Sequence, residues 1–196
     1  LNDAQRQAVT AESQRLLVLA GAGSGKTKVL VHRIAWMIKA LNSSTHSVLA
    51  VTFTNKAANE MTSRIEQILS QPIPEIWCGT FHSISNRILR RHHAQADLEK
   101  DFSILDSDDQ LRIIKRIVKR LEIDEDQWPA DKVRWQINKW KDDGLRPNKI
   151  EDKGDFNIEI LKKIYIDYEN YMRSENLLDF AELILSCLLY TSPSPR

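Results

Sequence analysis

A glycine-rich octapeptide between an apolar run and an amphipathic stretch constrains this chain more than any other feature. Residues 20–27 read AGAGSGKT, after the apolar run 16–19 and before a stretch whose apolar residues recur at helical spacing. Strand, glycine-rich turn and helix are the context that a phosphate-binding P-loop requires. The sequence therefore predicts a nucleoside triphosphate, ATP or a relative, together with Mg²⁺, as the ligand.

Each residue type in this loop has a physical task. Glycines lack a Cβ atom, so backbone N–H groups can approach phosphate oxygens, and the helix after the loop directs its positive end at the same anion. Lys26 is expected to reach the β- and γ-phosphates, and the hydroxyl of Thr27 to bind Mg²⁺. A Gly/Ser linker, the alternative interpretation, predicts neither flank. The expected phosphate site comprises Ala20, Gly21, Ala22, Gly23, Ser24, Gly25, Lys26 and Thr27, with Ala20 standing where the strict pattern has glycine.

Composition and length are those of an ordinary globular protein, and the charge is unevenly distributed. The chain has 196 residues, enough for one core or somewhat more. Residues 1–90 hold 10 Lys and Arg against 5 Asp and Glu, whereas residues 91–190 hold 17 against 22. A basic first part suits polyanion binding.

Cysteine usage and hydropathy bear on the compartment. Cys78 and Cys187 are far apart and lack metal-ligand spacing, which fits buried thiols in a reducing compartment. No stretch approaches the roughly 18 apolar residues of a membrane span, and the first residues show no signal-peptide pattern. We expect a cytoplasmic protein without a membrane partner.

The first part of the chain alternates strand and helix patterns. Strands are expected at 15–20, 47–53 and 76–81, and helices at 1–9, 25–41 and 55–70. This alternation predicts an α/β fold, a P-loop NTPase parallel sheet with helices on both faces. Residues 1–85 form the first expected domain.

After about residue 85 the strand patterns end and helices follow one another. Apolar residues recur at helical spacing at 111–121, 133–140, 158–173 and 178–189. The second expected domain, 86–189, is therefore all-helical. The proline-rich end, 190–196, interrupts an apolar helical pattern and is expected to lie outside the fold.

An ATPase of this class also needs a strand that ends in Asp, often followed by Glu, and no such strand is visible. Asp179 and Glu182 lie in a helical pattern and are poor candidates. Together with the three-stranded sheet, this indicates a fragment of a longer enzyme.

The segments around the P-loop narrow the choice among NTPases. Residues 1–9 (LNDAQRQAV) look like the adenine-reading Q motif of superfamily 1 helicases, 51–58 (VTFTNKAA) like motif Ia and 79–83 (GTFHS) like motif Ib. In this order and spacing they resemble the UvrD/Rep/PcrA family of DNA helicases. Four further segments, at 104–107, 124–129, 141–147 and 178–183, look most like the UvrD branch, so the resemblance extends over about residues 1–188.

The resemblance implies roles for individual residues. Gln5 would bind the adenine edge, because an amide offers both a donor and an acceptor, and Lys28 would join the phosphate site. Lys28 stands where close relatives carry Arg, and a lysine cannot bind a phosphate in the bidentate geometry of arginine. The implied DNA-binding residues follow two strands, at the edge where α/β proteins bind ligands. They are Thr52, Phe53, Thr54, Asn55, Lys56, Thr80, Phe81 and His82.

Each of these residues also has a structural or solvent-exposed role as the alternative to a ligand contact. Taken alone, Gln5 would be a solvated helix residue, Phe53 a core residue and His82 a surface or structural histidine. In the helical part, which matches the family's 1B subdomain, Arg90, Arg91, Lys139 and Lys141 are candidates for DNA contact, and a solvated charged face is the alternative for each.

The family implies an ATP-dependent 3′–5′ DNA helicase that couples ATP hydrolysis to translocation on single-stranded DNA and duplex unwinding, in DNA repair. Single-stranded DNA, junctions of single and double strands and repair proteins would be its partners, and RecA-like domain 1A would be its ATP-binding part. The alternative is that this chain by itself is a nucleotide- and DNA-binding module without ATPase turnover.

Overall fold

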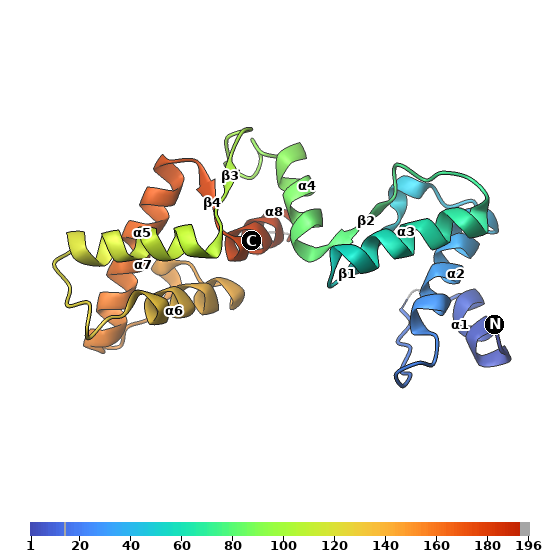
Figure 1. Ribbon diagram of the computed structural model, residues 1–196, viewed down its shortest axis with the longest axis horizontal. Coiled ribbons are helices and arrows are strands. Elements are labelled where there is room, and N and C mark those ends of the chain that lie inside the picture. Colours follow the sequence, from blue (N-terminus) through green and yellow to red (C-terminus); the bar gives the residue numbers. More distant parts are fainter. Residues whose placement is uncertain (14, 193–196) are drawn as a thin grey trace. The chain divides into compact units, whose positions relative to one another are not determined.

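The computed structural model of the chain describes residues 1–13 and 15–192, and the chain divides into two compact units between Ile84 and Ser85. The division falls within one helix, α4 (Phe81–Arg91), and lies one residue from the boundary expected from the sequence. The N-terminal unit mixes helices with a small parallel sheet, and the C-terminal unit is mainly helical (Figure 1).

In the N-terminal unit, two short strands pair in parallel and a helix connects them. The strands are β1 (Leu49–Thr52) and β2 (Trp77–Thr80), with Leu49 opposite Trp77 and Thr52 opposite Thr80. Parallel strands need such a crossover connection, and α3 (Asn55–Leu69) supplies it. The remaining elements are α1 (Asp3–Thr10), α2 (Lys26–Lys39) and the 3₁₀ turn η1 (Thr45–Ser47).

Local sequence explains where these helices begin. Asn2 and Gln5 form a capping box at α1, in which each side chain accepts a hydrogen bond from the other residue's backbone N–H. The Thr54 hydroxyl accepts from the N–H of Ala57 at 3.2 Å and caps α3. The core then forms among α2, β1, α3 and the residues around β2. Its buried members are Val31, Ile34, Ala35, Val48, Ala50, Met61, Ile65, Leu69, Ile73 and Ile76.

The expected strand at 15–20 is not a strand among the described residues, and the expected three-stranded sheet has two strands. Residues 16–20 have no regular secondary structure, and Leu17 and Leu19 are 80% and 84% exposed. Apolar residues favour a strand only where a neighbouring strand satisfies the backbone and a second layer covers the side chains. In the described part of the chain, β1 pairs with β2 alone.

The C-terminal unit is built mainly from α5 (Ser107–Arg120), α6 (Ala130–Asp142), α7 (Phe156–Ser174) and α8 (Phe180–Thr191). A 3₁₀ turn, η2 (Pro147–Lys149), lies between α6 and α7. The main core lies among α5, α6 and α7, where Ile114, Val133 and Tyr168 are fully buried. A second cluster joins Leu89 of α4 and Phe102 to Leu183 of α8.

This unit is not all-helical, which corrects the expectation from the sequence. Two short strands, β3 (Ser103–Ile104) and β4 (Leu177–Leu178), pair in parallel. The N–H of Ser103 donates to the carbonyl of Asn176 at 2.9 Å, and that of Leu105 to Leu178 at 2.8 Å. Strands of two residues are too short to show an alternating pattern, so the sequence did not reveal them.

Helix α8 continues through Tyr190 and Thr191, two residues of the segment expected to lie outside the fold. The ring of Tyr190 stacks on that of His92 with centroids 5.3 Å apart. Residues 193–196 of that segment lie outside the described residues. Among the helices of 1–13 and 15–192, none is long and apolar enough to cross a membrane.

Candidate functional site

The glycine-rich loop leads directly into α2, as the sequence predicted. Gly23 and Gly25 have φ angles of 75° and 85°, a left-handed conformation that glycine adopts without steric cost. A Cβ built at Gly21 or Gly23 would meet no atom within 4 Å, so the backbone here faces open space. A methyl side chain at either position would therefore meet no other part of the described chain.

Helix α2 begins without a side-chain cap. Its N-cap residue is Gly25, and no side chain accepts a hydrogen bond from the first turn. The first N–H groups of a helix have no intrahelical acceptor and carry a partial positive charge. The start of α2 thus offers donors to an anion lying in the loop.

Lys26 lies at the first position of α2 and turns back over the loop. Its Nζ donates to the carbonyl oxygens of Ala20 at 2.8 Å and Gly21 at 2.7 Å. The hydroxyl of Ser24 also donates to Gly21, at 2.7 Å, which closes the turn. These contacts hold the ammonium at the mouth of the loop, where it can exchange carbonyl partners for phosphate oxygens.

The other expected loop residues are also close to this turn. Thr27 and Lys28 lie in the first turn of α2, and both side chains are exposed. Ala22 is exposed within the loop. In the described residues no cluster of three or more His, Cys, Asp or Glu could hold a metal ion by itself.

Gln5 lies against the loop, although it is 19 residues away in sequence. Its Nε2 donates to the carbonyl oxygen of Ser24 at 3.0 Å, and its Oε1 accepts from the N–H of Asn2 at 3.1 Å. A Cβ at Gly25 would lie 3.1 Å from the Gln5 Nε2, and the φ angle of 85° at this position favours glycine. The structure thus brings Gln5 and the glycine-rich loop together.

The eight expected DNA-contact residues lie at the ends of β1 and β2 and in the turns that follow. Thr52 ends β1, and Thr54, Asn55 and Lys56 form the cap and first turn of α3. Because β1 and β2 are parallel, their carboxyl ends meet at one edge of the sheet. Thr80 ends β2 directly opposite Thr52.

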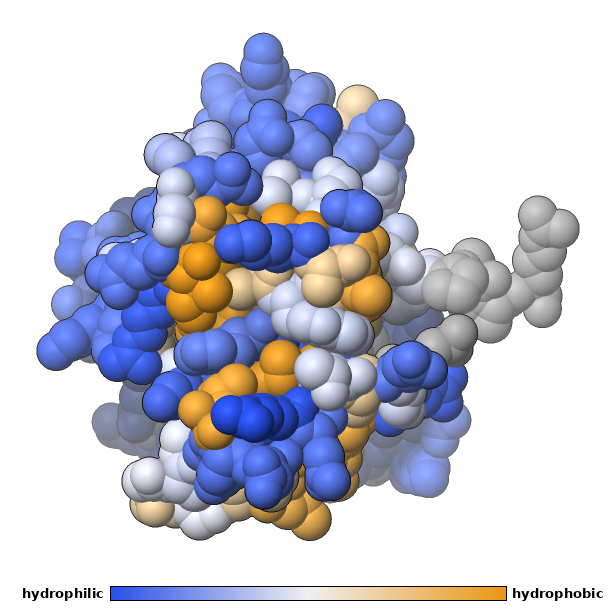
Figure 2. Space-filling view, turned by 90° about the vertical axis from the view of Figure 1, so that its right-hand side faces the viewer, coloured by the Kyte–Doolittle hydropathy of each residue, from blue (hydrophilic) through white to orange (hydrophobic). Residues whose placement is uncertain are grey.

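Two phenylalanines at this edge are open to solvent. Phe53 is 92% exposed and Phe81 is 52% exposed, and their rings meet edge to face with centroids 6.1 Å apart. The core alternative for Phe53 is therefore wrong, because burial would remove almost all of its surface from water. Apolar surface also lies between polar regions on the face that Figure 2 shows, which is the right-hand side of Figure 1.

Thr80, Phe81 and His82 lead from β2 into α4. The backbone N–H of Thr80 donates to the Ser83 hydroxyl at 2.8 Å, and that hydroxyl donates to the Thr80 carbonyl at 3.0 Å. This turn fixes the start of α4 and leaves the side chain of His82 exposed. A built Cβ at Gly79 would lie 2.5 Å from the Ser83 Oγ, so this approach also requires glycine.

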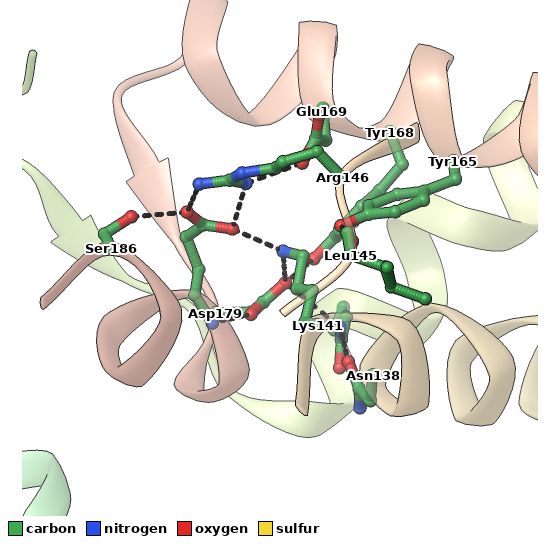
Figure 3. Close-up of polar contacts among 11 residues, drawn as sticks. Asn138, Lys141, Leu145, Arg146, Tyr165, Tyr168, Glu169, Asp179 and Ser186 are labelled. Atoms are coloured by element: carbon green, nitrogen blue, oxygen red, sulfur yellow. Dashed lines mark hydrogen bonds and ion pairs between the residues drawn. The ribbon is translucent and has the colours of Figure 1, made fainter. Parts of the chain in front are cut away.

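Lys141 does not face a ligand, which removes it as a candidate for DNA contact. Its side chain is 1% exposed and lies in a buried ion network of the C-terminal unit, drawn in Figure 3. Its Nζ is 2.7 Å from Asp179 Oδ2 and 3.0 Å from Glu182 Oε2. The Tyr168 hydroxyl donates to the same Asp179 oxygen at 2.7 Å. The spacing of residues along the sequence did not reveal that Lys141 is buried while some of its neighbours on the helix are exposed.

Asp179 and Glu182 are also held within this network. Asp179 caps α8 by accepting from the N–H of Glu182 at 2.7 Å, and Arg146 donates to Glu182 Oε1 at 2.6 Å and to Glu169 at 2.6 Å. Burial alone would raise the pKa of Glu182, but Lys141 and Arg146 outweigh it and lower that pKa to about 2. The pKa of Lys141 is lowered by burial and raised by the two carboxylates, with a net increase. These carboxylates are structural, as their helical pattern indicated.

The remaining cationic candidates of the C-terminal unit are exposed, and two of them lie against aromatic rings. Arg90 lies over the Phe102 ring, 3.7 Å from its centroid, and donates to the carbonyl of Lys100 at 3.0 Å. Lys139 lies 5.1 Å from the ring centroid of Trp135. Arg91 is exposed at the end of α4.

Comparisons with known proteins agree with these motifs. A family model described as "UvrD/REP helicase N-terminal domain" matches residues 1–195. DNA helicase II of Escherichia coli is 52% identical over 185 residues, covering 94% of this chain and 26% of that protein. ATP-dependent DNA helicase PcrA of Bacillus subtilis is 38% identical over 189 residues, with 96% of this chain and 26% of that protein covered. The chain thus spans about a quarter of the length of these relatives.

Proposed function

The chain belongs to the UvrD/REP helicase N-terminal domain family, and we propose that it is the ATP- and DNA-binding N-terminal part of an ATP-dependent DNA helicase. The observation that carries the proposal is the conformation of the loop at residues 20–27, in which the Lys26 ammonium lies against the loop carbonyls and α2 begins without a side-chain cap. In this proposal the N-terminal unit is the RecA-like, P-loop NTPase domain 1A, and the unit from Ser85 onward is the helical 1B subdomain.

In the nucleotide site, the loop and α2 bind the triphosphate. N–H groups of the loop and of the first turn of α2 bind phosphate oxygens, and Lys26 neutralises their charge. Lys28 adds a second positive charge in that turn. The Gln5 amide, already beside Ser24, has one N–H and one lone pair left for the adenine edge. Mg²⁺, when bound, supplies charge neutralisation at the phosphates, with the Thr27 hydroxyl as its protein ligand.

Single-stranded DNA would lie along the edge formed by the carboxyl ends of β1 and β2. Phe53 and Phe81 offer exposed ring faces on which bases can stack. Thr54, Asn55 and Lys56 at the start of α3, with Thr80 and His82 after β2, offer donors to backbone phosphates. The β1 edge and the P-loop belong to one compact unit, so nucleotide-dependent movement could reach the DNA.

In the intact protein we propose that ATP binding and hydrolysis open and close the site and move single-stranded DNA in the 3′–5′ direction, unwinding a duplex at a junction. DNA repair in the cytoplasm, with repair proteins as partners, is the setting that the family suggests. For this chain by itself we propose binding without turnover. The observation that favours this is that Asp179 and Glu182, the acidic pair after β4, are occupied by Lys141 and Arg146.

Titration of the chain with ATP in the presence of Mg²⁺, by isothermal titration calorimetry, tests the nucleotide site. We expect saturable binding that Lys26→Ala weakens at least tenfold, because a charged hydrogen-bonding partner of the phosphates is lost. Lys39→Ala, at the other end of α2, is the matched control and should bind as the unaltered chain does. Equal affinity in the Lys26→Ala chain would reject the P-loop assignment.

A steady-state ATPase assay with and without single-stranded DNA separates the two activities. Binding without turnover predicts no hydrolysis above background under either condition. DNA-stimulated hydrolysis by this chain would show that it contains a complete catalytic site, and our proposal for the isolated chain would then fail.

A further inference from the structure

One guanidinium in the N-terminal unit links the helix that carries Gln5 to the helix that follows the P-loop. Arg33 lies in α2, and its Nη1 donates to the carbonyl oxygens of Ala8 at 2.9 Å and Val9 at 3.0 Å. Both carbonyls belong to the last turn of α1. The last carbonyls of a helix have no intrahelical donor, so Arg33 satisfies groups that α1 cannot satisfy itself.

The charge of Arg33 also suits this position. The C-terminal end of a helix carries a partial negative charge, and α1 has no basic residue in its own last turn. Arg33 is half-buried, which strengthens the interaction relative to an exposed pair. The guanidinium presents fixed N–H groups, whereas a lysine would offer a single mobile ammonium.

Helix α1 is therefore attached to the P-loop and α2 at both of its ends. Near its start, the Gln5 Nε2 donates to the Ser24 carbonyl at 3.0 Å. Near its end, Arg33 binds the terminal carbonyls, and Val9, 5% exposed, is buried beside them. Because the Gln5 side chain is also held by the N–H of Asn2, its position depends on where the whole helix lies.

We infer that Arg33 is a positioning residue for recognition of the nucleotide base. By holding α1 against α2, it keeps the Gln5 amide beside the triphosphate site. Arg33 would thereby set the preference for adenine and leave phosphate affinity to the loop. This inference rests on the proposed ATP site and on the proposed role of Gln5.

The test is calorimetric titration of the whole chain, with Mg²⁺, using ATP, GTP and inorganic tripolyphosphate. Arg33→Met removes both hydrogen bonds and keeps an apolar stem of similar length. We expect the Kd for ATP to rise about 2- to 10-fold, because one or two neutral hydrogen bonds between the Gln5 amide and the base are lost. The preference for ATP over GTP should shrink as well. The Kd for tripolyphosphate, which has no base, should stay unchanged.

Two variants serve as controls. Arg33→Lys keeps the positive charge at the end of α1 and should restore part of the ATP preference. Arg64→Met makes the same substitution at an exposed arginine of α3 that pairs with Glu60, and should change none of the three affinities.

A double-mutant cycle tests whether Arg33 acts through Gln5. Gln5→Ala combined with Arg33→Met should weaken ATP binding no more than Gln5→Ala alone, because both changes remove the same contact with the base. Fully additive losses would overturn the inference, and so would equal weakening of ATP and tripolyphosphate by Arg33→Met. If the unaltered chain binds neither ATP nor tripolyphosphate, the proposed function itself fails. If it binds both of these and Arg33→Met leaves the ratio of the Kd values for ATP and GTP unchanged, only the role of Arg33 is rejected.

Discussion

At the scale of single residues, the candidate nucleotide site depends on groups whose tasks differ. Glycines at 23 and 25 permit positive φ angles, and Lys26 supplies a charge that bonds to two loop carbonyls. Gln5 is oriented by a capping box and by Ser24. The glycine positions and the helix after them follow from residue type and spacing, whereas the phosphate, Mg²⁺ and adenine roles of these residues stay predictions.

Other residues could not be understood without the structure. The sequence pattern left Phe53 open between core and surface, and its 92% exposure decides for the surface. The burial of Lys141 depends on carboxylates 38 and 41 residues further along the chain, at Asp179 and Glu182. The same holds for Arg33, whose partners lie in α1. Long-range partners of this kind have no local sequence signal.

Phe53→Ala is predicted to weaken binding of single-stranded DNA by roughly 1–3 kcal/mol, the value of one lost base–aromatic stack. Because Phe53 is 92% exposed, the melting temperature should change little. Fluorescence anisotropy with a labelled oligothymidylate measures the affinity.

Phe156→Ala is the matched control, since Phe156 is also exposed, at 67%, but lies at the start of α7 in the other unit. It should leave the DNA affinity unchanged. Equal affinities for the unaltered and Phe53→Ala chains would place the DNA path elsewhere.

At the scale of elements, the buried ion network ties together the helices of the C-terminal unit. Lys141 comes from α6, and Tyr168 and Glu169 come from α7 (Figure 3). Glu182 comes from α8. Each buried charge has opposite charges within hydrogen-bond distance, which buried ions require. The network thus fixes how α6, α7 and α8 pack.

Glu182→Gln is predicted to destabilise the chain by about 3–5 kcal/mol, because two buried or half-buried cations lose one of their partners. Urea unfolding followed by circular dichroism measures the change. Glu151→Gln, which breaks an exposed pair with Lys153, should stay within about 0.5 kcal/mol of the unaltered chain. Similar losses from both substitutions would contradict a structural role for the network.

Acid should weaken the same unit over a defined range. The pKa of Glu182 lies at about 2 in the folded chain and at its ordinary value of 4.5 when unfolded. Below pH 4.5 the unfolded chain therefore takes up a proton that the folded chain excludes, so this contribution to stability is complete above 4.5 and is lost progressively toward pH 2. The urea midpoint of unfolding should decrease as the pH is lowered through this range, and it should decrease less steeply in the Glu182→Gln chain. Identical slopes would show that Glu182 makes no such contribution.

Local sequence patterns predicted the positions of the helices well, but they did not predict which strands pair. Helices α2, α3 and α5 to α8 all lie where apolar spacing and caps predicted them, within a few residues. The prediction of a strand at 15–20 was wrong because a strand forms only where it can pair, and pairing depends on segments that are distant in the sequence. The pairing of β3 with β4 was missed for the same reason.

At the scale of the whole molecule, two compact units divide the chain near residue 84. The change from alternating strand and helix patterns to successive helices predicts a boundary at about residue 85, and the assignment of the two parts to domains 1A and 1B stays a prediction. The proposed functions are divided unevenly, since the P-loop, Gln5 and the exposed phenylalanines all lie in the first unit. The central claim is therefore that ATP binds there, on the loop at residues 20–27.

Hydrogen–deuterium exchange of the chain, with and without ATP and Mg²⁺, tests this claim most directly. We predict that ATP slows exchange in peptides covering residues 20–28 and the start of α1, and that Lys26→Ala abolishes the protection. Exchange that ATP leaves unchanged in these peptides, or protection confined to the C-terminal unit, would contradict the account.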